Sequence, residues 1–174
     1  MSWAPIVVSV VLALVAGTLA SVDAAISAFS KARAEELEDE GRGGAGRLAQ
    51  ILEDPAPYLN SVLLVRVVAE TSSVVLVALV VADEVAGLWT RLLIAVGIMV
   101  VVSFVLIGVG PRTLGRQHAE SIALASALPV IGVTRLLGPI PQLLILLGNA
   151  VTPGKGFREG PFASEVDELA HLDL

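Results

Sequence analysis

Residues 1–22 carry no charged side chain, and this apolar run constrains the fold more than any other feature of the sequence. A helix that crosses a bilayer needs about 20 consecutive, mainly apolar residues. A cleaved signal peptide would have basic residues ahead of a shorter apolar stretch, and here no basic residue precedes the run. We therefore expect the segment to be retained as a membrane span.

The charged residues gather in the stretches between further apolar runs. Eleven of them fall within residues 31–54, and charged residues make up 16% of the whole chain. A soluble domain would carry about 25%. Long uncharged runs that alternate with polar loops predict an all-α integral membrane fold.

Three spans are predicted, at about residues 4–29, 58–82 and 88–108. Residues 30–57 are charged, favour helix and are interrupted by glycines, which predicts a helical hairpin at the cytoplasmic membrane surface. Residues 112–120 are polar, and residues 121–151 turn apolar again, but prolines, glycines and Arg135 interrupt them. Over residues 112–151 we expect one or two belt helices beside the bundle, with a broken fourth span as the alternative.

Lysine and arginine indicate the orientation. Residues 1–30 have neither, whereas the 31–57 segment has Lys31, Arg33, Arg42 and Arg47. Basic residues favour the cytoplasmic side. We therefore expect a multi-pass protein of the cell membrane with its N-terminus outside and its C-terminus in the cytoplasm. Residues 152–174 are interpreted as a linker and the start of a truncated cytoplasmic region.

Several functions are excluded by what the sequence lacks. There is no cysteine, so disulfides and cysteine metal sites are absent. The net charge of −6 provides no basic face for nucleic acid. We find no arrangement of nucleophile and base, and the glycines at 41–46 lack the Lys-Ser/Thr of a phosphate loop. The sequence therefore predicts a protein that is not an enzyme.

Two charged residues lie within the second predicted span. Arg66 and Glu70 are four residues apart and so share one face of a helix. A charge inside a span is costly and usually faces a partner or a water-filled cavity. Two interpretations stay open: a polar site in an ion path, or a mutual ion pair that fixes helix packing.

Further candidates lie at the ends of spans. Asp23 is the best single candidate for a cation ligand, although it could simply cap a helix or reach water. A glycine–proline break at 108–111 could expose carbonyls to an ion, or be a plain helix stop. The ion-path candidates are Ser21, Asp23, Arg66, Glu70, Gly108, Gly110 and Pro111, and the candidate metal ligands are Asp23 and Glu70.

Three stretches together resemble one family. The sequence DAAISAFSKAR at 23–33 resembles the SETALxSLSRAR end of the first span in the CNNM/CorC family. The sequence LEDPAPYLNSVLL at 52–64 resembles that family's LLEDPxxFLSTVLI, and GVGPRTLGRQHAE at 108–120 resembles its GExxPKxLAxxxAE turn. SEVDEL at 164–169 is similar to the SEEEL helix that leads into the family's cytoplasmic CBS domains.

The resemblance implies a dimeric membrane domain that is linked to Mg²⁺ or Co²⁺ efflux and related to hemolysin-like proteins. It implies as well that any nucleotide binds only through a CBS region, which this sequence does not include. It also implies an intramembrane ion site made by a first-span Ser, a second-span Asn and the Glu of the GExxPK turn. This chain departs from that pattern. The Ser position aligns to Ala20, with Ser21 adjacent; the GNxxxN motif reads VRVVAE at 65–70; and the turn Glu is Gly108.

Two function classes follow. The first is the membrane domain of a divalent-cation transporter, with Mg²⁺ as the expected ion. The second is a non-transporting membrane anchor or assembly factor, since a fixed Arg66 would repel a dication. For either class we expect a homodimer through the second and third spans, because small residues let membrane helices approach closely. Those residues are Ala69, Ser72, Ser73, Gly97 and Ser103.

Overall fold

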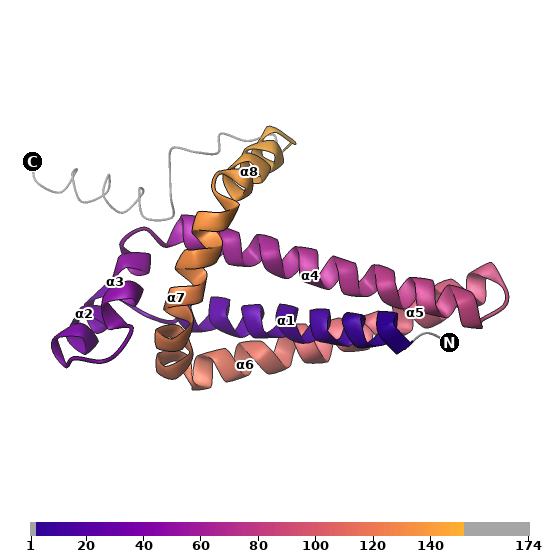
Figure 1. The fold of residues 1–174 in the computed structure, drawn as a ribbon, viewed down its shortest axis with the longest axis horizontal. Coiled ribbons are helices and arrows are strands. Elements are labelled where there is room, and N and C mark those ends of the chain that lie inside the picture. The colour runs from indigo at the N-terminus through magenta and orange to yellow at the C-terminus, as the bar shows by residue number, and fades with distance from the viewer. Residues whose placement is uncertain (1–2, 152–174) are drawn as a thin grey trace, which may run out of the picture. The chain divides into compact units, whose positions relative to one another are not determined.

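The computed structural model describes residues 3–151, which form helices joined by short turns without any strand (Figure 1). Three long helical segments of this part of the chain pack together. They are α1 (Trp3–Ser27), α4 (Pro55–Glu84) and a composite third segment made of α5 (Leu88–Val102), η1 (Ser103–Val109) and α6 (Gly110–Gln117). These bounds confirm the all-α membrane fold.

Helix α1 is the centre of this bundle. It contacts α4 along its length and also contacts η1 and α6. Its buried positions carry small side chains, among them Ala13, Ala16, Gly17 and Ala20, which let neighbouring backbones come close. Valines and leucines of α1, α4 and α5 are instead exposed on the outside of the bundle. An apolar outer surface on a helix bundle is expected where the bundle contacts lipid.

The third segment does not stop where the sequence predicted. We expected a break at Gly108–Pro111, but the helix runs on to Gln117, and Ser103–Val109 adopts the wider π-helical form. Pro111 is the second residue of α6, which follows the π-helix directly. The extra residue of the π-helix absorbs the change of register, so no stop is needed.

Helix α7 (Ala119–Leu137) passes through Pro129, where we expected an interruption. Four helices of the described chain, α7 included, are long and apolar enough to cross a membrane by length and composition. However, α7 runs across α1 and α4 rather than along them (Figure 1), and it contacts both. This placement suits the belt interpretation. A positive φ of 54° at Gly138 ends α7, and α8 (Ile140–Val151) forms a separate unit.

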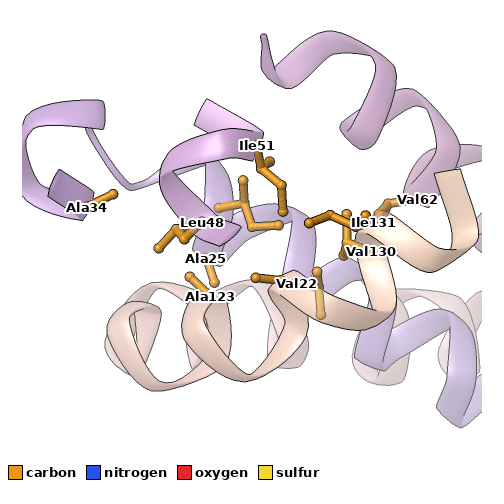
Figure 2. Close-up of a cluster of buried hydrophobic side chains, with 11 residues drawn as sticks. Val22, Ala25, Ala34, Leu48, Ile51, Val62, Ala123, Val130 and Ile131 are labelled. Atoms are coloured by element: carbon orange, nitrogen blue, oxygen red, sulfur yellow. The ribbon is translucent and has the colours of Figure 1, made fainter. Parts of the chain in front are cut away.

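Helices α2 (Lys31–Asp39) and α3 (Ala45–Glu53) form the expected hairpin and contact each other. Ser30 caps α2 by accepting a hydrogen bond from the Arg33 backbone N–H. Leu48 and Ile51 of α3 are fully buried, where they meet side chains of α1, α4 and α7 (Figure 2). We call these buried residues the hairpin core: Val22, Ala25, Ile26, Ala34, Leu48, Ile51, Val62, Ala123, Ala127, Val130 and Ile131.

Candidate functional site

Helix α1 closely approaches the joint of η1 with α6, and we call this contact the α1–η1 junction. The Ser21 hydroxyl donates a hydrogen bond to the Pro111 carbonyl at 2.8 Å, and Gly17 abuts the Leu106 carbonyl. Gly115 of α6 lies against the Ser21 backbone. Hydroxyl and carbonyl oxygens are thereby gathered where α1 meets η1 and α6.

The π-helix explains why carbonyls reach this junction. The Gly110 N–H bonds to the carbonyl of Val105, five residues back, instead of four. That register widens the helix and changes where its carbonyls point, and single π-turns inside α-helices are frequent at functional sites. Gly108 and Gly110 are both partly buried within this segment. Three of the predicted site residues, Ser21, Gly110 and Pro111, are therefore brought together.

Asp23 lies two residues beyond Ser21 on α1 and faces different neighbours. It lines a polar pocket of about 240 Å³ together with Ser27 of α1 and the α6 residues Arg112 and Arg116. Within residues 3–148, no ion pair joins Asp23 to either arginine. The two guanidinium groups make this pocket positive overall, which disfavours a bare dication there.

Arg66 and Glu70 are both partly buried on α4, but they do not pair with each other in the described chain. Of the two open interpretations, the mutual ion pair is therefore not formed in the described residues. Arg66 shares a helical stripe with Val62, Ala69 and Ser73, which are buried, and Ser73 bonds to α1. The arginine position thus belongs to the face of α4 that packs on α1.

Glu70 lies at the depth of the α1–η1 junction. Its neighbour Ala69 packs in a small cluster with Ala16 of α1 and Ile107 of η1. The other acidic residues of α4, Asp83 and Glu84, lie at the far end of the helix, so Glu70 is the acidic residue of α4 at this depth. Within the described residues, however, no group of three or more Asp, Glu, His or Cys side chains could hold a metal ion.

Small residues of α4 serve contacts inside the chain. Ser73 and Ser9 exchange hydrogen bonds, with their hydroxyls 3.0 Å apart, beside an apolar cavity of about 290 Å³. Ala69 is buried against α1 and η1. Ser73 and Ala69, two of the residues on which the predicted dimer contact rested, thus pack against other helices of the same chain. Gly97 of α5, by contrast, has open space around it.

An ionic cluster lies at the start of α7. Glu120 accepts from Arg42 at 2.8 Å and lies 3.7 Å from Arg33, which also pairs with Glu36 at 2.6 Å. The hydrogen bond that Arg33 donates to the Glu36 carboxylate, followed by the negative charge of that carboxylate, raises the pKa of the Arg33 guanidinium above its ordinary value. These exposed pairs connect the hairpin to α7.

Sequence reasoning did not single out Gly17, Gly115 or Glu120. Gly17 could have been found from the spacing Gly17-x-x-x-Ser21, because small residues four apart form close helix contacts in membranes. Gly115 sits in a polar stretch that gave no such signal. Glu120 could have been found only by knowing that α7 begins beside the hairpin.

The chain matches the family model described as the cyclin M transmembrane N-terminal domain over residues 7–173. It is also similar to two curated UPF0053 proteins, one from Mycobacterium bovis and one from Mycobacterium tuberculosis. Each is 49% identical over 166 residues, which cover 95% of this chain and 38% of the relative's own length. The membrane-length helices, the three resembling stretches and these matches agree: the chain belongs to the cyclin M transmembrane domain family, the family of the CNNM and CorC proteins.

Proposed function

We propose that the chain is the membrane domain of a divalent-cation transporter, with Mg²⁺ as the substrate, and that the ion passes the α1–η1 junction. The observation that carries the proposal is the meeting of the Ser21 hydroxyl with the Pro111 carbonyl at the end of a π-helix. Irregular helical backbone is frequent at functional sites and lines the ion paths of many membrane transporters.

The chemistry of the junction suits a hydrated ion. Mg²⁺ prefers hard oxygen ligands and usually keeps several of its waters. Ser21 and the carbonyls of η1 supply neutral oxygens that can accept hydrogen bonds from such waters or replace a few of them. In this proposal Glu70, at the same depth on α4, supplies the negative charge that a dication needs.

A second candidate function is a non-transporting dimeric anchor that positions a cytoplasmic CBS module. It is favoured by the absence of a metal-ligand cluster in the described residues and by Arg66 on the α1-facing stripe of α4. A guanidinium next to the proposed path would repel a dication unless another group neutralises it. In this alternative the arginine serves helix packing alone.

Ion flux distinguishes the two functions. The full chain is reconstituted in proteoliposomes, and Mg²⁺ movement is followed with an enclosed indicator. Transport predicts flux above empty vesicles and a loss of about tenfold or more in Ser21→Ala, which removes the hydroxyl at the junction. Ser61→Ala is the matched control, because Ser61 is buried but bonds within its own helix to Pro57. Folded protein without any flux would favour the anchor.

We also propose that residues 31–57 face the cytoplasm and that the chain forms a homodimer. The distribution of lysine and arginine supports the orientation. Since the chain has no cysteine, single cysteines at Gly43, which has open space around it, and at Glu84, which is exposed, can be labelled from either side of the membrane. Labelling of both from the same side would contradict this topology.

A further inference from the structure

The polar pocket is lined by two arginines and one aspartate, so the arginine charges are only partly balanced there. Arg112 and Arg116 are one turn apart on α6, are exposed and, within residues 3–148, make no ion pair. Arg33 and Arg42 of the hairpin, by contrast, both bind carboxylates. The pocket is therefore built from guanidinium groups that are free to bind an anion from outside the chain.

The depth of the pocket matches the headgroup layer of a bilayer. From Leu88 to Val109 the third segment rises about 33 Å, close to the thickness of the hydrocarbon core. Arg112 and Arg116 follow directly after this length. Val109 and Leu114 on the same segment are exposed apolar residues that can contact acyl chains.

The charge of the pocket fits a phosphodiester. Two arginines and one aspartate leave a net charge of +1, opposite to the single negative charge of a phosphodiester. Arginine binds phosphate oxygens through a planar fork of donors. Asp23 then remains as an acceptor for a hydroxyl or ammonium group elsewhere on the same headgroup.

We propose that this pocket binds a membrane phospholipid, with the phosphodiester held by Arg112 and Arg116 and a donor of the headgroup bound by Asp23. Phosphatidylglycerol meets both requirements, whereas phosphatidylcholine has the phosphodiester but no headgroup donor. The proposal is independent of ion transport, because it concerns a pocket separate from the α1–η1 junction.

The test measures lipid binding to the full chain by native mass spectrometry, with short-chain phosphatidylglycerol added to delipidated protein in a neutral detergent. Arg112→Gln with Arg116→Gln should raise the apparent Kd about tenfold or more, since two charge-assisted contacts are lost. Arg135→Gln is the matched control, because Arg135 is exposed near the end of α7 and forms no ion pair within residues 3–148. It should bind as the unaltered chain does.

Two further arms fix the chemistry. Phosphatidylcholine should bind more weakly than phosphatidylglycerol, and Asp23→Ala should remove that preference. Inorganic phosphate should compete poorly, because it has no acyl chains that could contact the exposed apolar residues beside the pocket. Equal losses in Arg135→Gln and in the double variant would overturn the proposal. Competition by inorganic phosphate as effective as that by the lipid, or equal binding of the two lipids, would overturn it as well.

Discussion

At the end of the bundle that carries α2 and α3, the helices surround the hairpin core, and Leu48 and Ile51 are fully buried there. At the opposite end, near Ser9, α1 and α4 meet through small side chains and the Ser9–Ser73 hydrogen bonds, beside an apolar cavity. We call these the hairpin end and the N-terminal end.

The difference follows from the solvent at each end. Where the protein meets water, burial of Leu48 and Ile51 gains hydrophobic free energy. Between helices surrounded by lipid, no such gain exists, because acyl chains are as apolar as leucine. Close packing of small residues and a few hydrogen bonds then hold the helices together. The hairpin end should therefore be the more sensitive to side-chain truncation.

The largest expected effect is on the hairpin core. Leu48→Ala should lower the free energy of unfolding by about 2–5 kcal/mol, because it leaves a cavity among buried side chains. Leu79→Ala, at a lipid-facing position of α4 with 58% exposure, is the matched control and should change it little. Unfolding in mild detergent measures both. If both variants lost the same free energy of unfolding, the distinction between the hairpin end and the N-terminal end would not hold.

Gly17→Ala should have the next largest effect, about 1–3 kcal/mol, because its new methyl group would meet the Leu106 carbonyl oxygen. Gly97→Ala has nothing within 4 Å of the added atom and should be neutral or slightly stabilising. The same unfolding assay applies. A neutral Gly17→Ala would mean that α1 and η1 are less closely packed than described.

The Ser9–Ser73 contact should contribute less. Hydrogen bonds between membrane helices are worth about 0.6 kcal/mol on average. A double-mutant cycle with Ser9→Ala and Ser73→Ala should give a coupling energy of about that size. Purely additive effects would show that this hydrogen bond does not hold α1 to α4.

The smallest effect is expected at the ionic cluster. Glu120→Gln should lower stability by about 0.2–1 kcal/mol at low salt, since exposed ion pairs contribute little. High salt should reduce the difference further. Asp39→Asn is the control, because Asp39 is exposed and outside the ion pairs of the described residues. A salt-independent loss would indicate a role other than ion pairing.

The long elements of this fold could be predicted because each depends on a local pattern. Apolar runs predicted the first two spans to within a few residues, and the rise in charge after Phe29 predicted the hairpin. The glycines and proline at 108–111 led to the wrong prediction of a helix end. These residues stop a helix only if the backbone cannot adopt another hydrogen-bond register, such as that of a π-helix. Whether a π-turn takes up the proline depends on the packing against α1, which no local pattern contains.

The candidate site could be predicted only in part, for a similar reason. Ser21 and Pro111 were chosen from their own chemistry, and the structure joins them. The partner of a charge depends on tertiary placement. The spacing of Arg66 and Glu70, four residues apart, therefore left a mutual ion pair open, and that pair does not form in the described residues. The arginines beside Asp23 come from α6, far along the chain, and changed the character of that residue's surroundings.

The central claim is that a divalent cation binds at the α1–η1 junction and not in the polar pocket beside Asp23. Anomalous scattering from Mn²⁺, used as a probe for Mg²⁺ in crystals of the full chain, locates the ion directly. We predict a peak between Ser21, the carbonyls of η1 and Glu70, with ordered waters around it. A peak beside Asp23, or no peak at the junction in protein that transports Mg²⁺, would contradict the account.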